Sequence, residues 1–162
     1  MSENFTHFNQ EGRSRMVDVT KKKETDRMAV ARGTIRMKKE TLDKIINHQM
    51  KKGDVLSVAQ IGGIMGCKHT WELIPMCHNI LITGSDLHFE TDAENNCIHI
   101  EAVLKTTGKT GIEMEALTAV SVAALTIYDM CKAVDREMVI EKICLMEKTG
   151  GHSGTFIRNE EH

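Results

Sequence analysis

Glycine, lysine, threonine and glutamate lie close together in residues 106–115, which read TTGKTGIEME. Gly108, Lys109 and Thr110 resemble the end of a phosphate-binding loop, but that loop needs a glycine five positions earlier, where Val103 stands. The segment instead predicts a turn that leads into a helix, and the free backbone N–H groups at a helix start favour an anion. An ordinary turn between a strand and a helix explains the same pattern equally well.

Two glutamates, Glu113 and Glu115, open the predicted helix. The helix dipole stabilises a carboxylate in the first turn by about 0.3–1 kcal/mol, so one glutamate needs no further function. Residues two apart on a helix point in different directions, and the two carboxylates therefore cannot serve the same contact. One of them is a candidate for a ligand site.

Asp129 and Lys132 lie three residues apart near the end of the same helix, on neighbouring surface positions. Either they form a weak surface ion pair, or they belong to a site. The surrounding residues, from Leu125 to Met130, are apolar nearly all round, and we expect the pair to be partly desolvated. Desolvation shifts pKa values, and shifted titratable pairs are site candidates.

His78 follows Cys77 between a predicted helix end and a predicted strand. A histidine there is suited to act as a general acid, a phosphate donor or a structural hydrogen-bonding group. Cys67, His69, Cys77 and His78 together offer zinc ligands, although their spacing matches no familiar zinc pattern.

Several lysines lie at the ends of predicted elements or beside glycine, where their ammonium groups are suited to bind a triphosphate. They are Lys51, Lys52, Lys68, Lys109, Lys132 and Lys148.

Hydrophobic periodicity predicts the elements that position these residues. Strands are expected at 28–37, 80–91, 97–107 and 138–147, and helices at 38–48, from Asp54 to about 65, at 68–74 and at 113–134. The order is that of a ferredoxin-like α+β domain, an antiparallel sheet with helices on one face and one extra early helix. We expect an arm at 1–23, a ferredoxin-like catalytic domain at 24–149 and a glycine-bearing tail at 150–162. Apolar residues on both sides of the last strand indicate that a partner covers part of the open sheet face.

Charge, hydrophobicity and cysteine content limit the classes of function expected of this protein. The formal net charge of −2 leaves no general electrostatic footprint for nucleic acid. The longest apolar stretch, about residues 117–125, is too short to span a membrane, and no secretory signal pattern is found, so a cytoplasmic protein is expected. Five cysteines without a CxxC pair are typical of reduced thiols.

Three motifs together resemble the MoaC family. They are residues 108–119 (GKTGIEMEALTA), 125–133 (LTIYDMCKA) and 73–78 (LIPMCH), and the shorter runs 16–19 (MVDV), 52–54 (KGD) and 148–151 (KTGG) agree with them. The resemblance covers about residues 5–156. Departures from the family pattern are Asn79 in place of a proline, His152 in place of a lysine, Gly66 and Cys67 in place of alanines, and Glu141 and Lys142 in place of Gly-Pro.

The resemblance implies a ferredoxin-like subunit that forms dimers and a homohexamer, with its active site at the dimer interface. It implies a lyase that converts 3′,8-cyclo-7,8-dihydroguanosine 5′-triphosphate into cyclic pyranopterin monophosphate and pyrophosphate in molybdenum cofactor biosynthesis, with no cofactor or metal ligand expected. By position, Asp129 would be the catalytic acid/base, with Lys52 and Lys132 beside it. The substrate-binding residues would be Met76, Cys77, His78, Glu113, Met114, Glu115, Lys68 and Lys148.

We further expect a shared site to take Lys52 from one chain and Asp129 from its neighbour. Two alternatives stay open: a zinc-dependent purine nucleotide hydrolase that uses the four Cys and His residues named above, and a non-catalytic interaction subunit.

Overall fold

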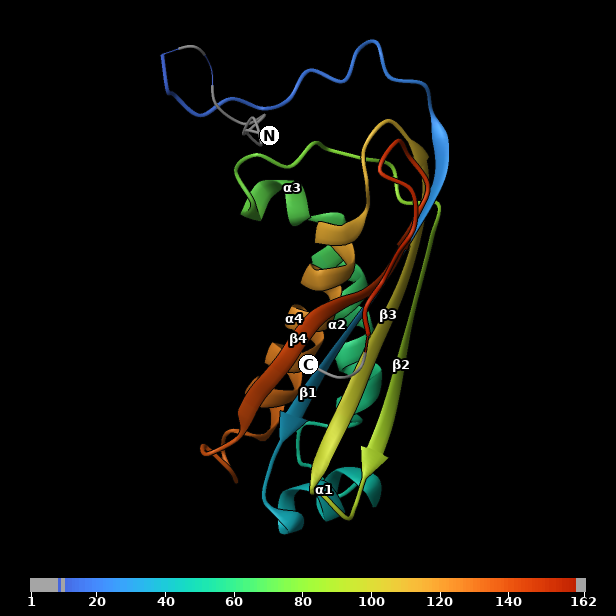
Figure 1. The fold of residues 1–162 in the computed structure, drawn as a ribbon. Coiled ribbons are helices and arrows are strands. Elements are labelled where there is room, and N and C mark those ends of the chain that lie inside the picture. The colour runs from blue at the N-terminus through green and yellow to red at the C-terminus, as the bar shows by residue number, and fades with distance from the viewer. Residues whose placement is uncertain (1–8, 10, 160–162) are drawn as a thin grey trace.

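The computed structural model describes residue 9 and residues 11–159. Along the chain the elements are β1 (Thr25–Arg36), α1 (Lys39–Ile46), α2 (Val55–Lys68), α3 (Thr70–Leu73), β2 (Gly84–Asp92), β3 (Cys97–Gly108), α4 (Glu113–Cys131), β4 (Val139–Thr149) and β5 (Phe156–Ile157). The strands form one antiparallel sheet in the order β2-β3-β1-β4-β5. Helices α2 and α4 cover one face of this sheet (Figure 1). The predicted ferredoxin-like α+β fold is confirmed.

The alternation of buried and exposed residues along β3 shows which face of the sheet packs against the helices. Ile98, Ile100, Ala102 and Leu104 are buried in the hydrophobic core, whereas residues 99 and 105 between and beyond them are exposed. Successive side chains on a strand point to opposite faces, so the even-numbered positions of β3 face α2 and α4. The odd-numbered positions lie on the open face of the sheet.

The two long helices pack against each other in opposite directions. Gly62 of α2 lies against Thr126 of α4, and Gly66, one turn later, lies against Val122. A Cβ atom at Gly63 would come within 2.9 Å of the backbone oxygen of Ala119, so glycine permits this close approach. The antiparallel packing places the start of α2 beside the end of α4, and the end of α2 beside the start of α4.

Helix α4 is long and apolar enough to cross a membrane by length and composition alone. In this fold it is the central helix of the core, with Ala116, Ala119, Val120, Ala123 and Ile127 at 0% exposure. Such a helix is hydrophobic because neighbouring elements surround it on most sides.

The pairing of β1 with β4 contains a β-bulge opposite Gly33. The pairing of β1 with β4 shifts register between Arg32 and Thr34, and Lys142 opposite has a positive φ of 56°. A Cβ atom at Gly33 would lie 2.6 Å from Cγ1 of Val120, which explains why the bulge carries glycine under α4.

The start of β2 and the tail differ from the prediction. Residues 80–83, expected to begin a strand, lie before β2, and of these the N–H of Thr83 donates to the backbone oxygen of Lys105 in β3. The glycine-bearing tail, in which no strand was predicted, contributes β5, which pairs with Glu147 and Lys148 of β4. Two residues are too few to give a recognisable alternating pattern.

Candidate active site

Asp129, Lys52 and Lys132 form an ion-pair cluster at the carboxyl end of α4. The Nζ atom of Lys132 lies 2.6 Å from Oδ1 of Asp129, and the Nζ atom of Lys52 lies 3.5 Å from Oδ2. Lys52 also donates to the backbone oxygen of Asp129 at 3.0 Å. Hydrogen bonding from Lys132 and then its charge, followed by the charge of Lys52, hold the pKa of the Asp129 carboxyl below its usual value of 3.8.

Two predictions about this cluster are wrong for the single chain. Asp129 was expected to be partly desolvated, but its side chain is 60% exposed, on a helix end where Leu125, one turn earlier, is itself 57% exposed. Lys52 was expected to meet Asp129 of a neighbouring chain, yet both belong to one chain. The antiparallel packing of α2 and α4 explains this contact, since Lys52 lies two residues before Asp54, the N-cap of α2.

A cavity of about 490 Å³ lies at the opposite end of α4. Six of the predicted site residues line it, and they are Met76, Cys77, His78, Glu113, Met114 and Glu115. The helix start brings the last three into the cavity, and the segment after α3 brings the first three. Of the two other predicted residues, Lys148 bonds to Ser153 of the cavity wall. Lys68 is exposed at the end of α2, which the helix packing places near the same end of α4.

The segment that follows residue 16 forms one wall of this cavity, and sequence reasoning did not place it in the site. His78 donates from Nε2 to the backbone oxygen of Val17 at 2.8 Å. Lys109 donates to the backbone oxygen of Thr20 at 3.1 Å. The only signal was the short MVDV run, which has no periodicity and gives no indication of its partner. The remaining lining residues are Val19, Lys22, Arg27, Thr110, Gly111, His152 and Ser153.

Glu115 is the buried carboxyl of the cavity, with 4% of its surface exposed. Burial is the main reason that its pKa is raised from 4.5 to about 7, and the charge of Glu113 acts in the same direction. The carboxyl of Glu115 is therefore able to gain and lose a proton near neutral pH, which is the property expected of a general acid or base.

The thiols of the four-residue zinc alternative are not arranged as a metal site. Burial raises the pKa of the Cys67 thiol to about 11, and burial and then the charge of Glu115 raise the pKa of Cys77. Cys67 donates to the backbone oxygen of Ile64, and His69 pairs with Glu72. Within residue 9 and residues 11–159, no group of three clustered ligand atoms includes any of the four.

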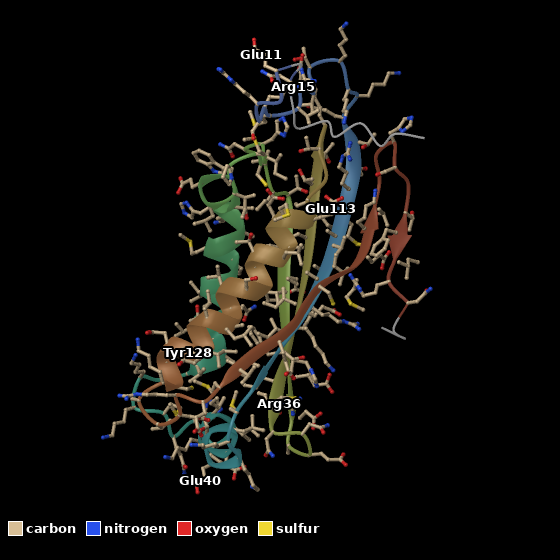
Figure 2. The ribbon with its side chains drawn as sticks, turned by 60° about the vertical axis from the view of Figure 1, so that its left-hand side comes forward. Glu11, Arg15, Arg36, Glu40, Glu113 and Tyr128 are labelled. Carbon is tan, nitrogen blue, oxygen red and sulfur yellow. The ribbon has the colours of Figure 1, made fainter. Side chains whose placement is uncertain are left out.

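The cluster and the cavity lie at opposite ends of one helix. Glu113 and Asp129 are sixteen residues apart along α4, which at 1.5 Å per residue separates their Cα atoms by about 24 Å. Figure 2 labels Glu113 near one end of α4 and Tyr128, next to Asp129, near the other. One chain therefore does not bring all the predicted site residues together.

Glu115→Gln is expected to abolish a pH dependence of stability. A carboxyl whose pKa is higher in the folded state binds more protons when folded, so wild-type stability falls as the pH rises from about 4.5 through 7. Glutamine does not ionise, so the variant has no buried negative charge at high pH. It should be more stable than wild type at pH 8 by about 1–3 kcal/mol and equal to it near pH 4.5. Urea unfolding at both pH values, with Glu113→Gln as the control from the same helical turn, measures this. Identical pH profiles for Glu115→Gln and wild type would contradict it.

Comparison with known proteins assigns the family. A model described as the MoaC family matches residues 16–151, and the chain therefore belongs to the MoaC family. A protein from Clostridium acetobutylicum is 64% identical over 158 residues, which are 98% of this chain and 98% of the relative. One from Thermoanaerobacter pseudethanolicus is 63% identical over 96% of this chain and 98% of the relative. One from Brevibacillus brevis is 56% identical over 99% and 100%. All three are named cyclic pyranopterin monophosphate synthase.

Proposed function

We propose that this chain is a cyclic pyranopterin monophosphate synthase, a lyase of molybdenum cofactor biosynthesis. Its substrate would be 3′,8-cyclo-7,8-dihydroguanosine 5′-triphosphate, and its products cyclic pyranopterin monophosphate and pyrophosphate. The observation that carries the proposal is the match of residues 16–151 to the MoaC family, with relatives of this name at 56–64% identity over nearly the whole chain. The site agrees with it, because the pKa of Glu115 is raised and that of Asp129 is lowered, each at one end of α4. Oppositely shifted carboxyl groups are suited to separate acid and base roles at one pH.

The roles of the residues follow from the chemistry of the reaction. Opening the guanine imidazole ring requires proton transfers to ring nitrogens and an activated water, and we assign Asp129 as the catalytic acid/base. Lys52 and Lys132 hold its carboxylate and supply positive charge beside it. Glu115, whose buried carboxyl has a pKa of about 7, is the second proton-transfer group, and it lies in the cavity.

The second part of the reaction is phosphoryl transfer. A sugar hydroxyl attacks the α-phosphorus and closes the cyclic phosphate, and the α–β anhydride bond breaks to release pyrophosphate. Positive charge on the leaving group lowers the barrier. We assign that charge to Lys109 in the cavity and Lys148 at its edge, with His78 as a hydrogen-bond donor. Met76, Cys77, Glu113 and Met114 line the pocket, and Lys68 lies beyond it.

The site requires two chains. Groups that transfer protons on one substrate must reach it at about 2.6–3.2 Å, which a separation of about 24 Å within one chain forbids. A twofold axis that crosses the middle of α4 at right angles would bring the Asp129 cluster of one chain to the Glu115 cavity of its partner, because such an axis exchanges the two ends of the helix. The helices offer an apolar surface for this contact, with Val58, Ile61, Met65 and Leu125 exposed by 42–63%. We extend the proposal to a cytoplasmic homohexamer built from three such dimers.

The purified chain, supplied with the cyclised guanosine triphosphate, should release pyrophosphate and form the cyclic pyranopterin in equal amounts. Mass spectrometry of the pterin product and an enzymatic pyrophosphate assay measure the two. Release of inorganic phosphate or an opened purine alone would indicate a nucleotide hydrolase. Absence of turnover by a correctly assembled oligomer would indicate an interaction subunit, and either result would overturn the proposal.

A further inference from the structure

Three ligand-type side chains meet on the open face of the sheet, away from the cavity and from α4. Asp92 ends β2, and Cys97 and His99 open β3. The sheet register places Asp92 directly opposite Cys97. His99 lies two residues further along β3, so it shares the face of Cys97. The hairpin itself therefore brings a carboxylate, a thiol and an imidazole to one place.

The two distances from His99 to the other ligand atoms are close to those around a tetrahedral metal ion. Nε2 of His99 lies 3.5 Å from Oδ2 of Asp92 and 3.7 Å from Sγ of Cys97. The three ligand atoms all lie within 4.8 Å of one another, and they form the only such group in the described part of the chain. Zinc bonds of about 2.0–2.3 Å at tetrahedral angles would place N, O and S ligands about 3.3–3.6 Å apart.

Neighbouring residues already hold two of the three ligands in position. Nδ1 of His99 lies 3.0 Å from the hydroxyl of Thr34, its cross-strand partner on β1, which leaves Nε2 directed at Cys97 and Asp92. Asn95 donates to both carboxylate oxygens of Asp92, at 2.9 and 2.7 Å. Hydrogen bonds of this kind fix the orientation of metal ligands and raise the affinity of a metal site.

The charges around the cluster tolerate a cation. Arg36, whose charge acts on Cys97, is bound to Glu141 at 2.7 Å and to the backbone oxygen of Asn95 at 2.9 Å, so its charge is offset. Cys97 is 1% exposed, and the cluster lies in a broad depression of about 1030 Å³ on the open sheet face. A buried sulfur beside an exposed imidazole leaves one side of the cluster open for a fourth, non-protein ligand.

We propose that Asp92, Cys97 and His99 form a binding site for zinc or a similar thiophilic divalent metal ion, with one coordination position open. Sulfur and imidazole ligands select zinc over magnesium or calcium, which bind oxygen ligands. The metal would tie the end of β2 to β3 at the edge of the sheet. The site is independent of the proposed catalysis and shares no residue with the zinc alternative weighed from the sequence.

The test compares two variants of the ligands with two matched controls. Cys97→Ser and His99→Gln each remove one ligand, and His99 is exposed enough for glutamine to be accommodated without refolding of the core. Cys144→Ser removes a thiol from the same depression, and His88→Gln removes a histidine that pairs with Asp86 instead. Each protein is stripped with chelator, kept reduced with a phosphine that does not bind metal, and titrated with Co²⁺ and then Zn²⁺.

Wild type and both controls should bind about one metal ion per chain, with the visible bands of tetrahedral Co²⁺ and a thiolate-to-cobalt charge-transfer band that Zn²⁺ removes. Cys97→Ser should lose the charge-transfer band, and both ligand variants should bind at least tenfold more weakly. Zinc should raise the thermal unfolding midpoint of the wild type and leave that of the two variants unchanged. Absence of stoichiometric binding by wild type, or binding by both ligand variants equal to wild type, would overturn the proposal.

Discussion

Asp129→Asn is expected to lower turnover of the cyclised nucleotide by about 10²–10⁴-fold, the range typical of a lost general acid or base. Asparagine keeps the shape of the side chain and one oxygen for the ammonium of Lys132, but it cannot exchange a proton with the substrate. Steady-state assays of pyrophosphate release over a range of substrate concentrations measure the effect. The loss should appear in kcat, because the proton is transferred after the substrate is bound.

Asp43→Asn is the matched control for this substitution. Asp43 forms an exposed ion pair with Lys39 on α1, at 2.6 Å, which resembles the pair of Asp129 and Lys132 in type and distance. Its loss should leave turnover within about twofold of wild type, since exposed pairs contribute at most about 1 kcal/mol to stability. Near-normal turnover by Asp129→Asn would remove Asp129 from the mechanism.

Mixing two inactive variants should restore about a quarter of wild-type activity when their lesions lie at opposite ends of α4. Asp129→Ala damages the cluster, and His78→Ala damages the cavity, so each homodimer lacks one group in both sites. In a mixed dimer one site carries both lesions and the other carries none. Random pairing after joint unfolding and refolding makes about half of the dimers mixed, and each keeps one of two sites.

The same experiment with Lys52→Ala and Asp129→Ala should restore nothing. Both residues belong to the cluster of one chain, so every site in a mixed dimer lacks one of them. Recovery by this second pair, or no recovery by the first pair despite demonstrated subunit exchange, would show that the site is not divided as proposed. Native mass spectrometry of one isotopically labelled partner verifies the exchange.

Much of the fold could be predicted because the local periodicity of apolar residues indicates most of the helices and strands. The strand at 97–107 and the helix at 113–134 each have clear periodicity, and the structure places them at 97–108 and 113–131. The helix predicted to start at Asp54 does so, because the carboxylate of Asp54 accepts the N–H of Ser57 at 3.1 Å as the N-cap of α2. The short strand β5 was missed because pairing with β4, rather than its own two residues, defines it.

The geometry of the candidate site was less accessible from sequence. Residue types identified Asp129, Lys132 and Glu115, but their surroundings depend on tertiary packing. The contact of Lys52 with Asp129 spans 77 positions of sequence and arises only because α2 and α4 run in opposite directions. The burial of Glu115 and the exposure of Asp129 are likewise set by neighbouring elements, which a helical pattern does not reveal.

The length of helix α4 fixes the angle about the helix axis between the Asp129 cluster at one end and the Glu115 cavity at the other. Each residue of an α-helix adds 1.5 Å and about 100° of rotation, so inserting one residue at its middle would turn the Asp129 cluster by about 100° relative to the Glu115 cavity. Substitutions along the outer surface of α4 leave that angle unchanged, whereas an insertion or deletion would alter it in both sites of the proposed dimer. The length of α4 is thus a mechanical constraint on the chain, separate from the identity of any residue within it.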